Sequence, residues 1–280
     1  AGHIGLSKLF DFYSYTRYIV SGGLGIGQKG YRIGDPMLIP FANDFFRPIG
    51  GIYGVMELQP GQVNWGSINP QPYPGAVRLW LWSVFAGGSD FTCTYRFRQP
   101  IYGDEQYHAG IVGTDGVTPS RGGLEYQQFI KDIAKLRKEY NAKATQPATY
   151  VKRKTAILYN VDNTWSMSKQ KQTQEWNTDS HIQKYYKPLK SFGAPVDVIN
   201  ESADWSKYPV LIAPAYQLVD DQLIEKWTTY AKQGGHLILT CRSGQKDRSD
   251  RLFELPFGGK IAELIGAKMD FFDLLVPSDP

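Results

Sequence analysis

The feature that most constrains this chain is an alternation of short apolar stretches with helical patterns between residues 155 and 266. The helical patterns fall at 181–193, 220–235 and 259–266, and the apolar stretches that separate them read TAILYNV, PVDVIN, PVLIAPA and HLILTC. Strands that are apolar on both faces belong in a parallel sheet covered by helices on both sides. We therefore expect a doubly wound, flavodoxin-like α/β domain over residues 149–280.

The first half of the chain shows the same alternation with longer polar loops. Strands are expected at 9–19, 51–59 and 90–99, and each is followed by a helical pattern, at 37–49, 74–88 and 122–141. Three strand-then-helix units with long loops at the strand ends resemble the closing part of a (β/α)8 TIM barrel, which needs about 250 residues. Residues 1–148 are therefore expected to be the C-terminal portion of a barrel that lacks about five strands, with residues 1–3 a cloning remnant.

Composition argues against several classes of protein. The net charge is +4 with both signs interspersed, so the basic run at 152–154 is interpreted as a solvated linker and no nucleic-acid partner is expected. Cys93 and Cys241 lack a CxxC partner, which indicates neither a disulfide scaffold nor a cysteine zinc site. This cysteine usage favours a reducing, cytoplasmic location, with a secreted or periplasmic one as the open alternative. No apolar run approaches the roughly 18 residues of a membrane span, so no membrane partner is expected.

Two catalytic motifs are considered and set aside. A GxGxxG pattern occupies residues 25–30, but no helix opens directly after it, so a dinucleotide cofactor is not expected. The glycine-rich segment 21–34 is interpreted as a mobile rim over a site. No GxSxG elbow occurs, and His3, His181 and His236 are scattered, so a Ser-His-Asp triad is not indicated.

The first candidate site residue is Glu57, at the end of the second strand in VMELQPGQVNWG. Carboxyl ends of barrel strands carry the active sites of this architecture, although a lone strand-end carboxylate also serves structural roles. The following loop supplies Gln59, Asn64 and Trp65. Carboxylate, amides and an aromatic ring are the mixture that a sugar-binding site needs.

A second candidate group follows the third strand in YGDEQYHAG. Glu105 and His108 are three residues apart and are flanked by Tyr102 and Tyr107, so an acid and an imidazole can converge on neighbouring hydroxyl groups. Glu-x-x-His is also a metal-ligand spacing on a helix, but the nearby glycines favour a loop and no further ligands are evident. We therefore expect no metal here.

These motifs resemble the barrel's closing segment in the glycoside hydrolase family 42 β-galactosidases. The resemblance rests on VMELQPGQVNWG, NPQPYPGAVRLWLW, FTCTYRFRQP and GDEQYHAGIVGTDG, in this order over residues 10–140. Residues 150–275 resemble the family's second domain, a flavodoxin-like module that mediates trimer formation. The resemblance implies a retaining β-galactosidase that acts as a trimer.

When the family's residue roles are assigned to the matching positions, the resemblance implies that Glu57 is the catalytic nucleophile. Trp65 would line the galactose subsite, and Glu105 with His108 would bind sugar hydroxyls. Tyr18 would match a tyrosine near the end of strand six, although Thr16 stands where the family usually carries Asp. The cysteine cluster that binds zinc in some members is absent.

The partner carboxyl group is missing from the barrel part. Retaining glycosidases need two carboxyl groups about 5 to 5.5 Å apart, and the family supplies the acid/base from an Asn-Glu pair at the fourth strand. The chain's one such pair, Asn200-Glu201, follows a strand of the second domain. The resemblance thus predicts that this fragment is inactive alone and that its exposed barrel edge pairs with another chain or segment.

Two further interpretations stay open from the sequence. The parent could act on β-fucosides or α-arabinopyranosides, which share the axial-hydroxyl pattern of galactose, or could be a retaining glycanase of another barrel family. Alternatively, the chain could serve as a non-catalytic assembly module, with the second domain as its interface.

Overall fold

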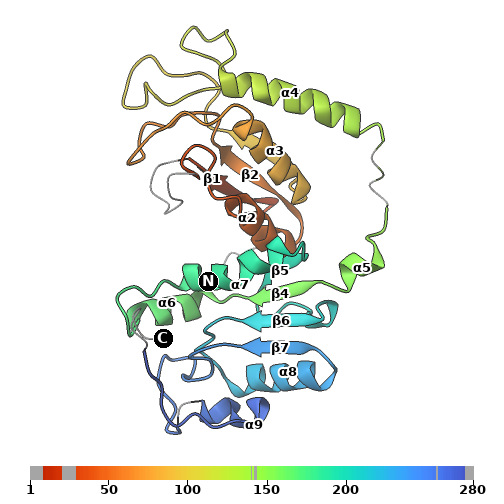
Figure 1. The fold of residues 1–280 in the computed structure, drawn as a ribbon, viewed down its shortest axis with the longest axis vertical. Coiled ribbons are helices and arrows are strands. Elements are labelled where there is room, and N and C mark those ends of the chain that lie inside the picture. Colours follow the sequence, from red (N-terminus) through yellow and green to blue (C-terminus); the bar gives the residue numbers. More distant parts are fainter. Residues whose placement is uncertain (1–8, 21–29, 140, 142–143, 257, 275–280) are drawn as a thin grey trace. The chain divides into compact units, whose positions relative to one another are not determined.

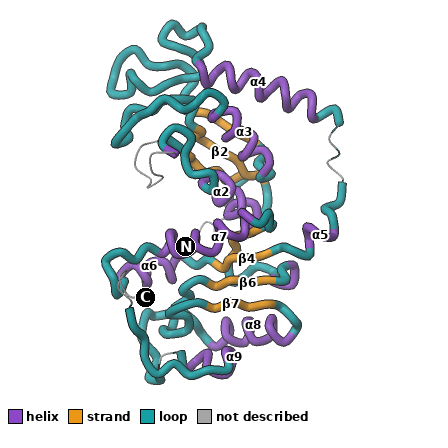
Figure 2. The backbone as a smooth tube through the Cα atoms, in the orientation of Figure 1, coloured by secondary structure: helices purple, strands orange, loops and turns teal. Residues whose placement is uncertain are grey.

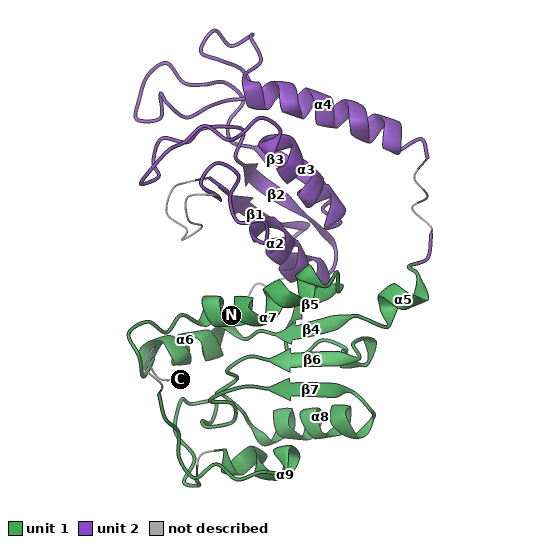
Figure 3. Ribbon diagram, viewed as in Figure 1, with its two compact units in different colours: residues 1–5, 146–280 green, residues 6–145 purple. Residues whose placement is uncertain are grey.

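The computed structural model describes residues 9–20, 30–139, 141, 144–256 and 258–274. Its contacts divide the chain into two compact units (Figure 3). One contains residues 6–145, here called the barrel unit, and the other contains residues 146–280, here called the flavodoxin-like unit. Residues 25–29 of the GxGxxG pattern, like the rest of 21–29, lie outside the described residues.

The barrel unit is a parallel sheet in the order β1-β2-β3, flanked by helices (Figures 1 and 2). Its strands are β1 (Phe12–Arg17), β2 (Ile52–Leu58) and β3 (Phe91–Thr94). Its helices are α2 (Leu38–Phe46), η2 (Arg47–Ile49), α3 (Ala76–Ala86) and α4 (Arg121–Leu136). Because each strand is followed by a helix and all strands are parallel, the carboxyl ends of all three meet at one edge. The predicted run of three strand-helix units is confirmed.

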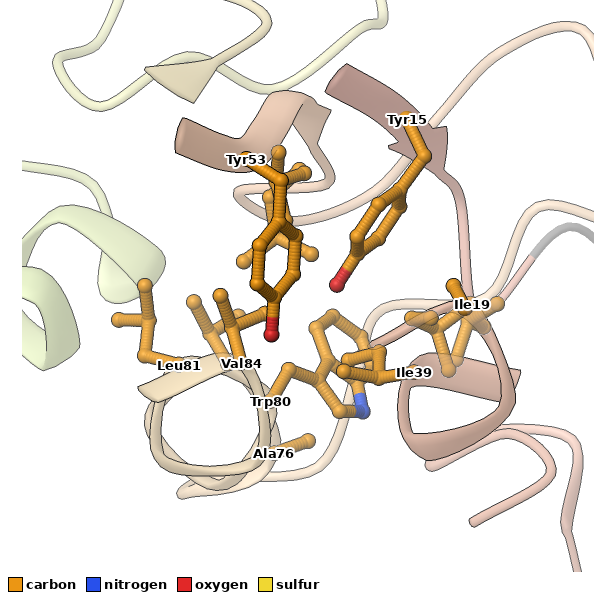
Figure 4. Packing of buried hydrophobic residues seen from close by; sticks show 13 residues of the cluster. Tyr15, Ile19, Ile39, Tyr53, Ala76, Trp80, Leu81 and Val84 are labelled. Atoms are coloured by element: carbon orange, nitrogen blue, oxygen red, sulfur yellow. The ribbon is translucent and has the colours of Figure 1, made fainter. Parts of the chain in front are cut away.

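The barrel unit's core lies between the sheet and α3 (Figure 4). Tyr15 and Tyr53 point from the strands toward Trp80 and Val84 of α3. The polar tips of both tyrosines have partners: Tyr53 Oη donates to Gly87 O at 2.5 Å, and Tyr15 Oη donates to Asn43 Oδ1 at 2.7 Å. Full burial of each large apolar side chain is worth about 1.5–3 kcal/mol. This packing fixes the sheet from which the strand-end side chains project.

The flavodoxin-like unit is a four-stranded parallel sheet in the order β5-β4-β6-β7. Its strands are β4 (Thr155–Leu158), β5 (Val196–Ile199), β6 (Val210–Ala213) and β7 (His236–Leu239). Its helices are α5 (Ala148–Val151), α6 (Val161–Lys169), α7 (Thr178–Ser191), η3 (Trp205–Lys207), α8 (Asp221–Lys232), η4 (Gly259–Ile261) and α9 (Ala262–Ile265). Every residue of β4 and β5 is buried, which is typical of a sheet covered on both faces. The predicted doubly wound arrangement is confirmed.

Several predicted boundaries are wrong. The first strand, predicted over 9–19, is confined to β1. The strand predicted from 155 ends at Leu158, because Asn160 caps α6 by accepting hydrogen bonds from Asp162 N and Asn163 N. That helix was not predicted, and neither was α5 in the expected linker. His236 does not begin a buried strand, since it is exposed in the edge strand β7.

The third strand is also shorter than predicted. It ends at Thr94, whereas the sequence pattern had extended it over 90–99. Residues 95–99, which were predicted to be part of this strand, therefore lie beyond its end. Within the described residues, no helix is long and apolar enough to cross a membrane.

Candidate active site

Glu57 is the penultimate residue of β2, at the carboxyl edge of the sheet. A register shift between Tyr15 and Thr16 of β1 places Thr16 opposite Glu57. The carboxylate is half-buried, and its Oε2 accepts a hydrogen bond of 2.8 Å from the hydroxyl of Tyr18. Tyr18 directly follows β1, so the ends of two neighbouring strands supply this pair.

Trp65 and His108 contact the same tyrosine. The ring of Trp65 packs edge-on against Tyr18, with the centroids 4.8 Å apart, and 51% of the Trp65 surface is exposed. His108 lies perpendicular to Tyr18 at 6.0 Å. The structure thus brings four predicted site residues, Glu57, Tyr18, Trp65 and His108, into one contiguous cluster at the strand ends.

The side chain of His108 is fully buried, and only one of its two ring nitrogens has a hydrogen-bond partner among the described residues. Its Nδ1 lies 3.1 Å from the carbonyl oxygen of Ala109, which assigns the ring proton to Nδ1 and leaves Nε2 as an acceptor. Nε2 has no hydrogen-bond partner among the described residues. Burial is the main cause that lowers the pKa of His108 below its usual value. A neutral imidazole with a vacant acceptor can take a hydrogen bond from a ligand hydroxyl.

Glu105 is held by two donors that follow β3. Tyr95 Oη donates to Glu105 Oε2 at 2.7 Å, and Arg96 Nη1 donates to the same oxygen at 2.9 Å. Tyr95 also packs perpendicular to His108 at 5.4 Å. The carboxylate of Glu105 is therefore oriented through one oxygen by a cation and a hydroxyl group.

Both tyrosines that hold the carboxylates are fixed as neutral donors. Burial first, and then the hydrogen bond to Glu57, raises the pKa of Tyr18. The hydrogen bond to Glu105 is the main cause that raises the pKa of Tyr95. Each hydroxyl keeps its proton at neutral pH and donates a hydrogen bond to a carboxylate, which is an arrangement that orients negative charge.

The loops that carry these residues are joined to each other. Asn64 Nδ2 donates to Asp104 O at 2.6 Å, and Ala109 N donates to Gln62 O at 2.8 Å. The loop after β2 and the loop after β3 are therefore held together by two hydrogen bonds. Glu105 additionally lines a cavity of about 380 Å³ with Arg96 and Tyr102.

Sequence reasoning missed Tyr95 and Arg96. Had the third strand been predicted to end at Thr94, both residues would have been identified, because residues at strand ends are site candidates, as Glu57 is. The predicted flanking residues Tyr102 and Tyr107 are each 80% exposed. Among the described residues, no group of three or more histidine, cysteine or acidic side chains could hold a metal ion.

The one Asn-Glu pair of the chain is placed elsewhere. Glu201 lies in the flavodoxin-like unit just after β5, where Arg248 donates to both of its oxygens, at 2.9 Å and 2.7 Å. The buried hydroxyl of Tyr216 also donates to it. Glu201 is thus engaged within its own unit.

The fold is that of a partial TIM barrel with polar and aromatic residues at its strand ends, followed by a flavodoxin-like domain. Two family models match the chain: one described as β-galactosidase over residues 1–136, and one described as the β-galactosidase trimerisation domain over residues 153–280. Only residues 137–152 fall between the two matches. The chain belongs to glycoside hydrolase family 42, the family of these β-galactosidases.

Curated relatives agree with this assignment. β-Galactosidase Bga of Halorubrum lacusprofundi is 32% identical over 240 residues, which cover 85% of this chain and 33% of the relative. The β-galactosidase of Thermus thermophilus is 30% identical over 226 residues, which cover 80% of this chain and 33% of the relative. The chain thus spans about a third of the length of the curated relatives it matches.

Solved structures match the residues of both units. The polyextremophilic β-galactosidase of H. lacusprofundi aligns with a TM-score of 0.89 at 29% identity, covering 99% of this chain and 41% of that structure. The β-galactosidase of the psychrophilic Marinomonas ef1 aligns with a TM-score of 0.84 at 26% identity, covering 94% and 41%.

Proposed function

We propose that the protein to which this chain contributes hydrolyses terminal, non-reducing β-D-galactose residues with retention of configuration. The observation that carries the proposal is the Tyr18–Glu57 contact of 2.8 Å at the carboxyl edge of the barrel strands. It supports Glu57 as the nucleophile, because one oxygen is held by a neutral donor while the carboxylate stays at the strand edge where barrel enzymes bind substrate. Attack on the anomeric carbon gives a galactosyl-Glu57 intermediate, which water then hydrolyses.

The surrounding side chains suit a galactose ring. Trp65 offers an exposed aromatic face for the apolar side of the sugar. Glu105, oriented by Tyr95 and Arg96, and the vacant Nε2 of His108 both accept hydrogen bonds from hydroxyl groups. A buried acceptor left unpaired costs about 1–3 kcal/mol. A sugar whose hydroxyl group donates to Nε2 should therefore bind more tightly than one that lacks this hydroxyl.

The proton donor for the leaving group comes from outside this chain in the proposal. General-acid assistance is worth roughly 10²- to 10⁴-fold, and Glu201 cannot supply it because it is bound to Arg248 within the flavodoxin-like unit. The chain alone is therefore expected to be inactive. In the parent protein, the open edges of the barrel sheet pair with the strands that this chain lacks. The trimerisation domain assembles three copies. We place the parent protein in the cytoplasm.

The test uses a polypeptide that carries the complete barrel, here called the whole-barrel protein. It should release nitrophenol from nitrophenyl β-galactoside, and proton NMR should show β-galactose as the first product. This chain alone should release none. A whole-barrel protein that cleaves no galactoside while Glu57 is intact would refute the proposal and favour an assembly module.

The β-fucoside and α-arabinopyranoside alternatives concern the same site. Both sugars share the axial hydroxyl of galactose, so Glu105 and His108 contact them equally well. The kcat/KM values on the nitrophenyl β-galactoside, β-fucoside and α-arabinopyranoside rank the three sugars as substrates. A preference for glucans over all three would instead favour a retaining glycanase.

A further inference from the structure

Gln59 is a fully buried amide that immediately follows β2. Its Oε1 accepts hydrogen bonds of 2.8 Å from both Ile19 N and Val20 N. Its Nε2 donates to Val20 O at 2.9 Å and to Gly61 O at 2.7 Å. A side-chain amide has two N–H donors and two acceptor lone pairs, so backbone groups use its entire hydrogen-bonding capacity.

These contacts continue the connection between two strands beyond the point where the sheet stops. β1 ends at Arg17 and β2 ends at Leu58, and Gln59 N still donates to Arg17 O at 3.3 Å. Beyond that bond, the side chain of Gln59 makes the hydrogen bonds between the two segments that backbone groups make within the sheet. Tyr18 therefore lies between a residue fixed in the sheet and two residues fixed by the amide.

We propose that Gln59 is a positioning residue that holds Tyr18 against Glu57 and thereby orients the attacking carboxylate. Tyr18 reaches Glu57 across 39 positions of sequence, and Gln59 lies two residues beyond Glu57 on the same strand end. The Gln59 amide thus connects the backbone just after Tyr18 to the strand end that carries Glu57. The catalytic part of this inference rests on the proposed function, whereas its structural part does not.

The chain offers a matched control for the effect of removing a buried amide. Asn43 in α2 is also fully buried; its Oδ1 accepts from Tyr15 Oη at 2.7 Å and its Nδ2 donates to Ser83 O at 3.1 Å. It lies in the same unit but bonds to core residues instead of the strand-end cluster. Gln59→Met and Asn43→Leu each replace an amide by an apolar side chain of similar size.

The first measurement is the crystal structure of each variant of this chain, which requires no activity. In Gln59→Met, the Tyr18 Oη to Glu57 Oε2 separation should exceed the hydrogen-bond limit of about 3.2 Å. In Asn43→Leu, it should stay at hydrogen-bond distance. A Gln59→Met structure with the contact intact would overturn the proposal. If that variant does not fold, Gln59→Asn, one methylene too short to span both partners, takes its place with the same two outcomes.

The second measurement is kinetic and uses the whole-barrel protein. Gln59→Met should lower kcat about 10²-fold, because small misplacements of a reacting group have effects of that size, while KM changes by less than about threefold. Asn43→Leu should lower the melting temperature but leave kcat within about twofold. Adding Gln59→Met to Tyr18→Phe should cause little further loss, because the amide acts through the tyrosine.

The outcomes separate the two proposals. An active wild-type protein whose kcat is unaffected by Gln59→Met, or whose Gln59 and Tyr18 effects multiply, overturns the positioning role. A wild-type whole-barrel protein without galactosidase activity refutes the proposed function instead. In that case the crystal structures alone decide whether Gln59 positions Tyr18.

Discussion

The two units of this chain place polar side chains at the ends of parallel strands in the same way but use them differently. In the flavodoxin-like unit, Asn163 in the first turn of α6 bonds to the segment that follows β6: its Oδ1 accepts from Gln217 N and Leu218 N, and its Nδ2 donates to Ala215 O. In the barrel unit, the strand-end cluster includes a half-exposed Trp65 and a buried imidazole nitrogen without a partner among the described residues. Position at a strand end alone therefore does not make a site.

Glu57 and Glu201 express this contrast most clearly. Each lies at or just after the end of a parallel strand. Glu57 accepts one hydrogen bond from a neutral hydroxyl group, whereas both oxygens of Glu201 are bonded to Arg248. A nucleophile must keep a lone pair for attack. The Arg248 guanidinium pairs with the charge of Glu201, whereas Glu57 faces a neutral donor, which fits the proposed nucleophile; the predictions below test this difference.

The largest expected effect is that of Glu57→Ala in the whole-barrel protein. Loss of a covalent nucleophile should lower kcat by about 10⁴-fold or more. Added azide should restore part of the turnover and give a product of inverted configuration, because azide attacks from the side that the carboxylate vacates. Normal activity in this variant would remove Glu57 from the role.

The matched substitution Glu201→Ala should leave kcat nearly unchanged and lower stability instead. It removes one of the two carboxylates that pair with Arg248, the other being Asp220, and leaves the Tyr216 hydroxyl, in a residue only 1% exposed, without its acceptor. An unsatisfied buried group costs about 1–3 kcal/mol. Urea unfolding of this chain measures the loss; a loss of turnover in the whole-barrel protein with stability intact would break the contrast between the two units.

Glu105→Gln should lower kcat/KM by about 10- to 100-fold, because a hydrogen bond to a charged group is worth about 1.5–3 kcal/mol. The amide can no longer pair with Arg96, which now orients the carboxylate at 2.9 Å. Steady-state kinetics on nitrophenyl galactoside measures the change. A variant with unchanged kcat/KM would show that Glu105 has a structural role only.

The smallest effect is a dependence of stability on pH that both units share. Burial lowers the pKa of His108 in the barrel unit and of His181 in the flavodoxin-like unit. Below its unfolded pKa of about 6.5, each imidazole takes up a proton more readily in the unfolded chain. The free energy of unfolding should therefore fall as the pH drops below about 6.5 and be insensitive to these groups above it.

Urea unfolding at about pH 5.5 and about pH 7.5 checks this expectation. His108→Asn and His181→Asn should each reduce the difference between the two conditions. A larger difference in either variant would contradict the direction of the pKa shift assigned to that histidine.

The sequence predicted the parts of the fold and cluster that depend on local patterns. Glu57 and Trp65 were identified because an apolar run ends in a carboxylate and a polar, aromatic loop. Tyr95 and Arg96 were missed because the strand was predicted to continue to residue 99, whereas it ends at Thr94. The helix α6 was missed although its cap, Asn160, is visible in the sequence.

Other features could not be predicted from local patterns. The amide of Gln59 bonds to backbone groups about 40 positions away, and the sequence carries no periodic signal for such contacts. The vacant Nε2 of His108 likewise depends on burial by two rings, Tyr18 and Tyr95, from different strand ends. Both follow from the parallel arrangement, which brings distant segments to one edge.

The central claim, that Glu57 forms the covalent intermediate, is tested most directly by trapping it. A 2-deoxy-2-fluoro-β-galactoside with a dinitrophenyl leaving group slows hydrolysis of the glycosyl-enzyme, so the label accumulates on the nucleophile. Mass spectrometry of peptides from the treated whole-barrel protein should place one fluorogalactosyl group on Glu57. A label on any other carboxylate, in a protein that hydrolyses galactosides, would contradict the account.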